Sequence, residues 1–563
     1  MCYAGAMIRD EIKQKIHEAL QKEGLVESDI ILEHPAERAH GDYATNIALV
    51  LAHRSGKNSR ELADRLLELL REERGEYIEK IEVAGPGFIN FYLTKSFFGK
   101  STREIVANPD IFGKNEILLG KKIMVEYTDP NPFKVFHIGH LMTNVIGESL
   151  ARLFEFCGAE VRRANYQGDV GLHVAKAISA KLRSGVVWMN AADIGTSYVE
   201  GEELFAKEPA FVQEINKKVY DKSDDAVNEA YEVGRAISLA AFEEMYKLLG
   251  TKFDHYFFES EVADTGKQIV EAYLDKGVFE RSEGAIIFPG ERYGLHTRVF
   301  LTKERLPPYE AKDLALAVQK YAVYPYDQSF VITASEQNAY YAVVQQAMRF
   351  IYPELAEKTV QIGHGMMRVE SGKMSSRKGN VVTGESLMHD AVFTAGEKIQ
   401  GEAIDEEERK KIAECVGIGA LKFSILKQQT RSDIIYDEER SFSLEGDSGP
   451  YLQYALVRAQ AVLTKAALQG LVRGFEKTDE IYSVEQLLYR FPEVVERASK
   501  EYEPHHIATY LIELAGDFNN FYATKKIIGG ADQASYRLAL TEAVHTVLCN
   551  GLHLLGISIP PKM

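Results

Sequence analysis

His137 and His140 flank an isoleucine–glycine pair at a point where a strand is expected to lead into a helix. Residues 122–127 form a short apolar segment typical of a strand, and the apolar spacing of residues 141–157 predicts a helix. The free N–H groups and partial positive charge of a helix start favour phosphate groups. Gly139 lets a ligand approach the chain closely, and the imidazoles can donate hydrogen bonds to phosphate oxygens. By itself, the motif also fits two surface histidines in a turn.

A second group of charged and small residues lies about 230 residues further along the chain. Residues 372–380 read Gly-Lys-Met-Ser-Ser-Arg-Lys-Gly-Asn, with three cations between glycines. This composition predicts a loop. A solvated basic loop has the same composition, but its occurrence together with the histidine motif favours a role for both in nucleotide binding.

The elements around the histidine motif form a strand–helix–strand unit. Residues 160–165 are a second predicted strand, and Gly158 stands where a glycine commonly ends a helix. Such units build parallel, doubly wound sheets. Residues 330–333 and 359–363 have the composition of later strands of the same sheet. The sequence therefore predicts an α/β domain built on a parallel sheet.

Segments on either side of this domain predict further units. The chain has 563 residues, well beyond the ~250–300 at which a single core stops growing. Residues 8–23 and 59–73 have helical spacing and residues 81–93 read as a strand pair, which predicts a small α+β unit. Residues 172–290 are mixed and mostly helical, which indicates an insertion, and the chain from about residue 387 onward is helical.

Composition sets broad limits on the class of protein. Hydrophobic content of 45% and charged content of 26% are ordinary for a globular chain. No apolar run of about 18 residues predicts a membrane span, and the N-terminus lacks a secretory signal pattern, so a cytoplasmic protein is expected. The four cysteines are dispersed, so no structural zinc is expected. A net charge of −17 argues mildly against a nucleic-acid partner but leaves room for local basic surface.

The two motifs together resemble the HIGH and KMSKS signatures of class I aminoacyl-tRNA synthetases. In that class both motifs bind ATP on a Rossmann-type sheet and stabilise the transition state of adenylate formation. Ser376 stands where the second signature has its second lysine, a departure that arginyl-tRNA synthetases often show. The resemblance implies that Lys378 or Lys134 supplies the missing charge. It implies catalytic roles for His137, His140 and Lys373, with Lys134 and Lys378, and ATP binding by His137, Gly139, His140, Lys373, Met374 and Ser375.

Four other segments resemble the arginyl-tRNA synthetase family, namely residues 40–46, 83–90, 449–455 and 551–557. The resemblance runs nearly end to end and is weakest at about 175–250.

This resemblance implies a reaction and a domain division. ATP, with Mg²⁺, activates L-arginine to arginyl-adenylate, and arginine then passes to the 3′-terminal ribose of tRNA(Arg). Activation is expected to require bound tRNA. The implied division is an N-terminal α+β tRNA-contacting domain at 1–110, a Rossmann-type catalytic domain at 118–385 with the insertion at about 172–290, and a helical domain at 386–563 that includes an anticodon-binding domain at about 440–563.

Recognition of arginine requires carboxylates, because the guanidinium group is planar and permanently charged. Residues 309–315 read Tyr-Glu-Ala-Lys-Asp-Leu-Ala and resemble the family segment whose tyrosine and aspartate hold that group. Each acidic residue taken alone has the pattern of a solvated surface charge. The arginine-binding residues that the resemblance implies are Glu126, Asn131, Glu259, Tyr309, Asp313 and Gln337.

Tyr451 and Tyr454 are three residues apart, on one face of a predicted helix. They fit core aromatics as well as the family's aromatics that meet splayed anticodon bases. With Arg458 they are the tRNA-binding residues that the resemblance implies, although Leu456 stands where the family usually has histidine. The expected partners are tRNA(Arg), L-arginine and ATP, for a monomer without membrane association.

Two other interpretations remain open. One is a different class I synthetase or related ATP-dependent ligase, although a cysteine-specific member would need Cys and His zinc ligands. The other is a non-catalytic tRNA-binding paralogue. The retention of His137, His140 and Lys373, together with Asn131 and Asp313, argues against it. Arginine-dependent ATP–pyrophosphate exchange, with and without tRNA, distinguishes the three.

Overall fold

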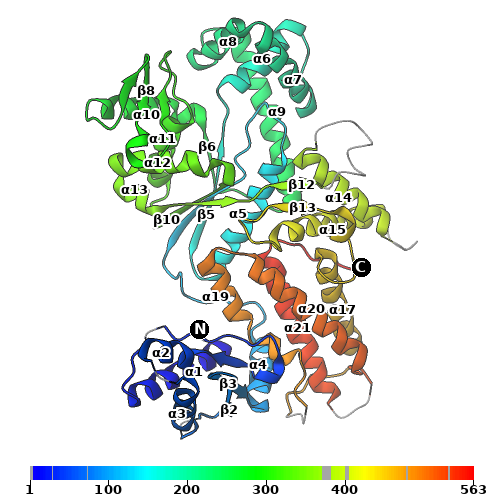
Figure 1. The fold of residues 1–563 in the computed structure, drawn as a ribbon. Helices are drawn as coiled ribbons and strands as arrows, with labels where there is room; N and C mark the ends of the chain where they lie inside the picture. Colours follow the sequence, from blue (N-terminus) through cyan, green and yellow to red (C-terminus); the bar gives the residue numbers. More distant parts are fainter. Residues whose placement is uncertain are drawn as a thin grey trace. The chain divides into compact units, whose positions relative to one another are not determined.

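The structure is a computed structural model that describes residues 4–27, 29–56, 58–72, 74–369, 382–399, 405–476, 480–529 and 533–563. The chain divides into two compact units. Unit 1 comprises Met1–Asn115, Tyr451–Ala498 and Thr509–Leu552, and unit 2 comprises Glu116–Pro450, Ser499–Ala508 and His553–Met563. Figure 1 gives the order of the elements along the chain.

A parallel sheet forms the centre of unit 2, with its five strands in the order β11-β10-β4-β5-β6. The strands are β4 (Lys122–Glu126), β5 (Glu160–Gln167), β6 (His255–Phe258), β10 (Gln328–Ala334) and β11 (Thr359–His364). Along the chain, β5 and β6 are added on one side of β4, and β10 and β11 are then added on its other side. Ligands of such sheets bind beyond the carboxyl ends of the strands, at this switch point. The predicted Rossmann-type parallel sheet is confirmed.

Helices cover both faces of this sheet because neighbouring side chains of a strand point to opposite faces. On one face lies α5 (Ile138–Phe156), where Phe154 packs on Phe330 of β10 with ring centroids 4.7 Å apart. On the other face, four helices share a core with Met124, Ala164 and Phe257. These helices are α10 (Glu259–Leu274), α11 (Tyr309–Val323), α12 (Asn338–Ile351) and α13 (Pro353–Lys358).

Between β5 and β6 the chain forms four helices with their own core around Phe133 and Trp188. They are α6 (Leu172–Ser184), α7 (Ala191–Lys207), α8 (Pro209–Asp221) and α9 (Asp225–Leu249), and Figure 1 shows the first three gathered at one end of α9. A small antiparallel sheet of β7 (Glu280–Ser282), β8 (Ala285–Phe288) and β9 (Arg298–Leu301) follows. β6 and α10 therefore lie inside the range 172–290 that the sequence marks as an insertion, yet they belong to the main α/β layers.

After the sheet, unit 2 continues with mostly helical elements. They are β12 (Met367–Val369), α14 (Gly384–Lys398), α15 (Glu406–Leu426), β13 (Ile434–Tyr436) and α16 (Glu438–Ser441). β12 pairs with β13 in parallel. The C-terminal segment His553–Met563, called the tail below, also belongs to unit 2.

Unit 1 combines the N-terminal segment with helices from the C-terminal part of the chain. Its elements are α1 (Ala4–Lys22), β1 (Tyr43–Thr45), α2 (Ile47–Ser55), α3 (Ser59–Glu72), β2 (Ile78–Ala84), β3 (Phe88–Leu93), α4 (Lys95–Ala107) and the parts within its ranges of α17 (Gly449–Leu468), α18 (Glu485–Leu488), α19 (Phe491–Glu501), α20 (His505–Thr524) and α21 (Ala534–Leu554). β1 and β2 pair with β3 in an antiparallel sheet. Tyr489 is buried in the core of the N-terminal elements. The Tyr43 hydroxyl donates to Glu493 over 2.5 Å, so the two chain segments form one packed body.

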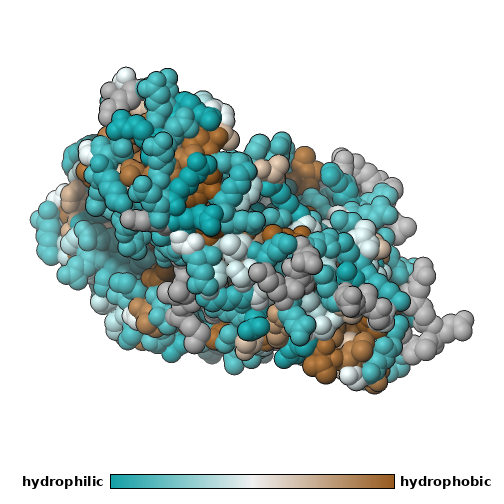
Figure 2. All heavy atoms as spheres, turned by 90° about the horizontal axis from the view of Figure 1, so that it is seen from below, coloured by the Kyte–Doolittle hydropathy of each residue, from teal (hydrophilic) through white to brown (hydrophobic). Residues whose placement is uncertain are grey.

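On the face that Figure 2 displays, the surface is mostly hydrophilic with separate hydrophobic patches. Among the described residues, no helix is both long enough and apolar enough to span a membrane.

Candidate active site

A cavity of about 470 Å³ lies at the switch point of the main sheet. Its wall is made by side chains from the carboxyl ends of β4 and β10, from the start of α5, and from α11 and α12. The wall includes nine of the residues that the sequence predicts, namely Glu126, Asn131, His137, Gly139, His140, Glu259, Tyr309, Asp313 and Gln337. Residues more than 200 positions apart in the sequence thus meet in one cavity.

His137 and His140 form a reciprocal cap at the start of α5. Nδ1 of His137 accepts from the backbone N–H of His140, and Nδ1 of His140 accepts from the backbone N–H of His137, both over 3.3 Å. The two rings stack with centroids 3.4 Å apart. Because each Nδ1 is an acceptor, the proton of each neutral ring is on Nε2, which is left free to donate.

Both imidazoles are held in their neutral form. Burial lowers the pKa of His137, and the neighbouring Lys134 lowers it further. Burial lowers the pKa of His140 well below its ordinary value, and His137 and Lys134 add to the effect. The start of α5 therefore offers neutral hydrogen-bond donors and backbone N–H groups, which suit phosphate oxygens.

Five carboxylates line the cavity, and two of them are neutralised by lysines of α11. Lys320 Nζ lies 2.6 Å from Glu126 Oε2, and Lys312 Nζ lies 2.5 Å from Glu259 Oε2. All four side chains are buried. Of the other three, Glu336 is exposed at the rim, which leaves Asp129 and Asp313 as the inner acidic groups that can receive a cation.

Asp129 and Asp313 have hydrogen bonds but no ion pair within the part of the chain that the structure describes. Asp313 Oδ2 accepts from the Tyr340 hydroxyl over 2.6 Å, and Asp129 Oδ1 accepts from the Tyr166 N–H over 2.7 Å. Burial raises the pKa of Asp313 to about 8, and Glu126 contributes to the shift. Burial also raises the pKa of Asp129 well above its ordinary value. A guanidinium or ammonium group would relieve the cost of both buried charges.

The other predicted arginine-binding residues lie around these carboxylates. Gly168 allows Asn131 and Glu259 to approach each other, because a Cβ atom there would clash with Asn131 Oδ1 and lie 2.8 Å from Glu259 Oε1. Tyr309, at the start of α11, is half exposed at the rim, and Gln337 is exposed just before α12.

Lys134 does not line the cavity that contains His137 and His140. It lines a neighbouring cavity of about 390 Å³ that shares Tyr309 with the first. Its Nζ is 5.5 Å from the ring centroid of Tyr198, and burial lowers its pKa. Lys373, Met374, Ser375 and Lys378 lie outside the described residues.

Sequence reasoning missed Asp129, Tyr340 and the two lysines of α11. Lys312 and Lys320 stand among the apolar residues of α11 and are buried with them, and a buried lysine usually has an ion-pair partner. Asp129 lies between Glu126 and Asn131, which the sequence did predict. Its position between these two residues was a sign that it could belong to the same site. Tyr340 gives no such sign, because tyrosine is common on helix faces.

In unit 1, Arg458 brings two tyrosines together on the surface of α17 and α20. Its guanidinium lies 4.6 Å from the ring centroid of Tyr454 and 4.9 Å from that of Tyr522, and Nη1 donates to Asn519 Oδ1 over 2.6 Å. Tyr522 was not predicted; its ring is 43% exposed, which leaves a face for stacking. Tyr451, also partly buried, faces Gly516 of α20.

The parallel sheet and the cavity at its switch point match a known catalytic domain. Residues 105–438 match the family model of the class I (R) tRNA synthetase catalytic domain. Residues 452–563 match the DALR anticodon binding domain, and residues 6–93 match the arginyl tRNA synthetase N terminal domain. The fold is that of a class I aminoacyl-tRNA synthetase.

Full-length relatives identify the family within this class. The chain is 30% identical to the arginine–tRNA ligase of Clostridium acetobutylicum and 29% identical to that of Halothermothrix orenii, over 98% of this chain and 100% of each relative. The Thermus thermophilus arginyl-tRNA synthetase structure superposes with a TM-score of 0.81 at 25% identity, covering 99% of this chain and 100% of that one. The Plasmodium falciparum arginyl-tRNA synthetase, at 19% identity and a TM-score of 0.80 over 99% of both chains, shares the fold. The chain belongs to the arginyl-tRNA synthetase family, and the predicted resemblance is confirmed.

Proposed function

We propose that the cavity binds L-arginine beside ATP, forms arginyl-adenylate with release of pyrophosphate, and then passes arginine to the 3′-terminal ribose of tRNA(Arg). Family membership makes the chain an arginine–tRNA ligase that uses ATP. One observation supports the assignment of both substrates, arginine and ATP, to this cavity. Asp313, a partly buried carboxylate with no ion pair among the described residues, and the start of α5 at His137 line the same cavity.

In this proposal the guanidinium of arginine pairs with Asp313, and Tyr309 closes over it from the rim. The other end of the amino acid then lies toward the carboxyl end of β4, where Asp129 and Asn131 suit an α-ammonium group. Glu126, Glu259 and Gln337 complete the pocket. Because Lys320 and Lys312 already neutralise Glu126 and Glu259, these two contribute mainly shape and hydrogen-bond acceptors.

ATP lies with its phosphates at the start of α5, against His137, Gly139 and His140. Lys373, Met374, Ser375 and Lys378 are proposed to contact ATP from the signature loop, where the lysines balance the charge that develops on the leaving pyrophosphate. The donors need no proton transfer, since both imidazoles are neutral and donate through Nε2. The catalytic contribution is electrostatic and positional, with the arginine carboxylate held in line with the α-phosphate.

Mg²⁺ is proposed to enter with ATP. Within the described residues no group of three or more His, Cys, Asp or Glu side chains is placed to hold a metal ion. The phosphates of ATP are therefore its main ligands, and the ion supplies charge neutralisation there.

The second step needs the terminal ribose of the tRNA next to the activated arginine. The cavity of about 390 Å³ that shares Tyr309 lies beside the first and holds Lys134 and the rings of Tyr198 and Tyr220. A cation with aromatic faces suits a terminal nucleotide, which supports a role for Lys134 at the tRNA end rather than at ATP alone. Tyr451, Tyr454 and Arg458, with Tyr522, are proposed to meet the anticodon. The family resemblance supports a monomer that acts in the cytoplasm.

Arginine-dependent ATP–pyrophosphate exchange tests the proposal. We expect exchange with L-arginine in the presence of tRNA(Arg), and little exchange with lysine or cysteine or without tRNA. Exchange that is strongest with another amino acid would assign the chain a different substrate. An absence of exchange with every amino acid would instead favour the non-catalytic paralogue.

A further inference from the structure

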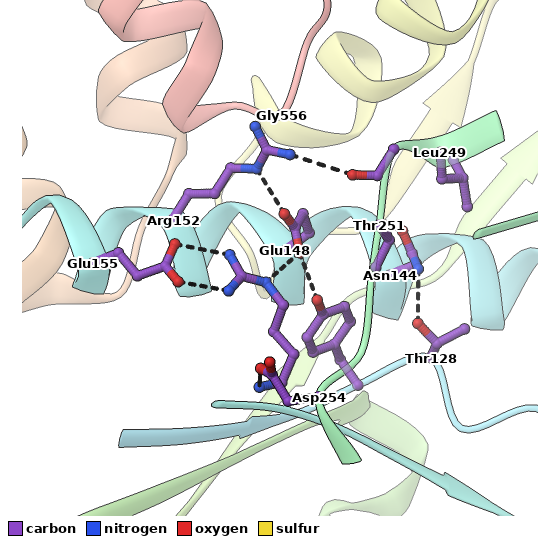
Figure 3. Close-up of polar contacts among 12 residues, drawn as sticks. Thr128, Asn144, Glu148, Arg152, Glu155, Leu249, Thr251, Asp254 and Gly556 are labelled. Atoms are coloured by element: carbon purple, nitrogen blue, oxygen red, sulfur yellow. Dashed lines mark hydrogen bonds and ion pairs between the residues drawn. The ribbon is translucent and has the colours of Figure 1, made fainter. Parts of the chain in front are cut away.

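Glu148 is the centre of a buried polar network on α5, the helix that begins at the two histidines. Its carboxylate is 4% exposed and accepts from the Tyr127 hydroxyl over 2.6 Å, from Arg152 Nε over 2.7 Å and from Arg163 Nε over 2.9 Å. Figure 3 shows these contacts converging on Glu148. Although burial opposes ionisation, the two arginines keep the pKa of Glu148 below its ordinary value. The lowered pKa favours the ionised form of Glu148, which holds its three donors through charge-assisted hydrogen bonds.

On one side, the network holds the wall of the arginine pocket. Tyr127, which donates to Glu148, directly precedes Thr128 and Asp129, and both of these residues line the cavity. Asn144 is fully buried on α5, donates to Thr128 Oγ1 over 2.9 Å and accepts from Thr251 Oγ1 over 2.9 Å. Figure 3 shows Asn144 between these two threonines.

This wall needs external support because its backbone is strained. Thr128 and Asp129 have φ angles of 78° and 45°, in the left-handed region that side chains with a Cβ atom rarely adopt. Such conformations persist only where the surroundings over-determine them. On the α5 side, Thr128 and Asp129 are supported by Asn144, by the Tyr127–Glu148 hydrogen bond and by Thr143, whose Oγ1 lies 3.5 Å from the Thr128 backbone oxygen.

On the other side, the network holds the tail. Arg152 donates to the backbone oxygen of His553 over 3.2 Å, and Ser149 Oγ donates to that of Leu554 over 2.9 Å. Lys422 is buried and donates to the backbone oxygens of Gly556 and Leu249 over 2.5 and 2.6 Å. The tail therefore contacts the same face of α5 that carries Glu148.

Of the two arginines on Glu148, Arg152 is the one whose position depends on the tail. Arg163 also makes two hydrogen bonds of 2.6 and 2.9 Å to Glu155, and its backbone N–H is held by Asp254. Arg152 has no second carboxylate in the described part of the chain. Its other hydrogen-bond partners there are backbone oxygens of the tail and of the loop after α9, and the His553 ring.

We propose that the tail is a positioning element of the arginine pocket. It seats Arg152 on Glu148, and Glu148 and Asn144 in turn hold the Tyr127–Asp129 turn in its left-handed shape. The proposal rests on the proposed function, because the turn matters through the arginine that it contacts. None of the tail residues touches the cavity, so they act as positioning residues.

Kinetics of variants in the full-length protein test the inference. Arg152→Gln removes the charged donor that links the tail to Glu148, and Tyr127→Phe removes only the hydroxyl that links Glu148 to the turn. We expect the KM for arginine in tRNA-dependent pyrophosphate exchange to rise about tenfold or more in the first and about threefold to tenfold in the second. The KM values for ATP and tRNA should change less than about twofold. Arg152→Lys should recover part of the loss.

Two matched variants separate the tail from the rest of the fold. Ser149→Ala removes a hydrogen bond to the tail alone, and we expect it to raise the KM for arginine by about twofold to fivefold. Lys562→Ala removes the tail's partly exposed pair with Glu408, 2.8 Å long, which lies outside the Glu148 network, and should leave all three KM values unchanged.

An unchanged KM for arginine in Arg152→Gln, Tyr127→Phe and Ser149→Ala would overturn the inference. So would an equal rise in all three KM values together with a lower melting temperature, since that pattern marks a purely structural role. Exchange by the unaltered protein is measured alongside, because its absence would overturn the proposed function instead.

Discussion

The Tyr340 hydroxyl donates a hydrogen bond of 2.6 Å to Asp313 Oδ2, and this carboxylate has no cation beside it in the described residues. The two lysines of α11 pair with Glu259 and Glu126 instead. The cavity thus contains a carboxylate that is oriented but not neutralised. A cationic ligand stabilises the ionised form of such a group, because the ligand supplies the counter-charge that the surrounding side chains do not.

Asp313→Asn is expected to raise the KM for arginine by about 100-fold or more, the size of two lost hydrogen bonds to a charged group. The fold should be preserved, because an amide has the shape of the carboxylate and can still accept from Tyr340. Steady-state exchange and a melting curve measure the two effects. Asp275→Asn, at an exposed position after α10, is the matched control and should change neither. A KM in Asp313→Asn close to that of the control would remove Asp313 from arginine binding.

Arginine binding is expected to strengthen as pH rises from about 6.5 to 8.5. Burial raises the pKa of Asp313 to about 8, and only the ionised carboxylate pairs with the guanidinium. Below that pKa, binding must first remove a proton, which weakens it by up to about tenfold for each pH unit. Titration calorimetry at several pH values measures the dissociation constant. In Asp313→Asn this part of the pH dependence should be absent, and a slope equal to that of the unaltered protein would assign it to another group.

Stability of the ligand-free protein should change with pH in the opposite direction. The pKa of Asp313 is about 8 in the folded protein, against an ordinary value of 3.8 that applies to the unfolded chain, so between these values the folded protein holds the extra proton. The free energy of unfolding from this group therefore falls as pH rises through this window and levels off above about pH 8. Melting curves between pH 5 and 8.5 should show a smaller decline for Asp313→Asn than for the unaltered protein. Equal declines would mean that Asp313 does not carry the shift.

His137→Asn is expected to separate the capping role of His137 from its role in catalysis. Asparagine is a favourable N-cap and can still accept from the His140 N–H, so the melting temperature should be retained. The Nε2 donor is lost, and the exchange rate should fall by about 100-fold or more, as for loss of a positioned donor. His137→Ala loses both, and should also be destabilised by about 1 kcal/mol. A His137→Asn protein with normal exchange would limit His137 to capping.

The sequence was sufficient to predict the parts of the structure that follow from local pattern. The helix of α5, the two flanking strands and the His137 motif are close in the chain and have regular spacing, so each was predictable. β6 was not, because it has four residues of mixed burial and stands among helices. The arginine residues were predicted from family resemblance, since each carboxylate alone looks like surface charge.

The partners of those carboxylates could not be read from the sequence. Glu126 and Lys320 are 194 positions apart, and only the folded sheet brings them to 2.6 Å. Their pairing changes the roles within the cavity, because it leaves Asp129 and Asp313 to receive the cation. Long-range pairing of buried charges depends on tertiary packing, so the spacing of residues along the sequence does not predict it.

Tyr454→Ala and Tyr522→Ala are expected to weaken tRNA binding without affecting arginine or ATP. Arg458 holds both rings, with its guanidinium 4.6 and 4.9 Å from their centroids, which leaves aromatic surface for unpaired bases. Loss of one stacked base costs about 1–3 kcal/mol, so the KM for tRNA(Arg) should rise about fivefold to 100-fold. Tyr293→Ala, a partly exposed tyrosine of unit 2, is the control. The same ranking should hold for an isolated anticodon stem-loop used as a competitor. If the variants instead bind the stem-loop as tightly as the unaltered protein does, the two tyrosines are core aromatics and the anticodon is read elsewhere.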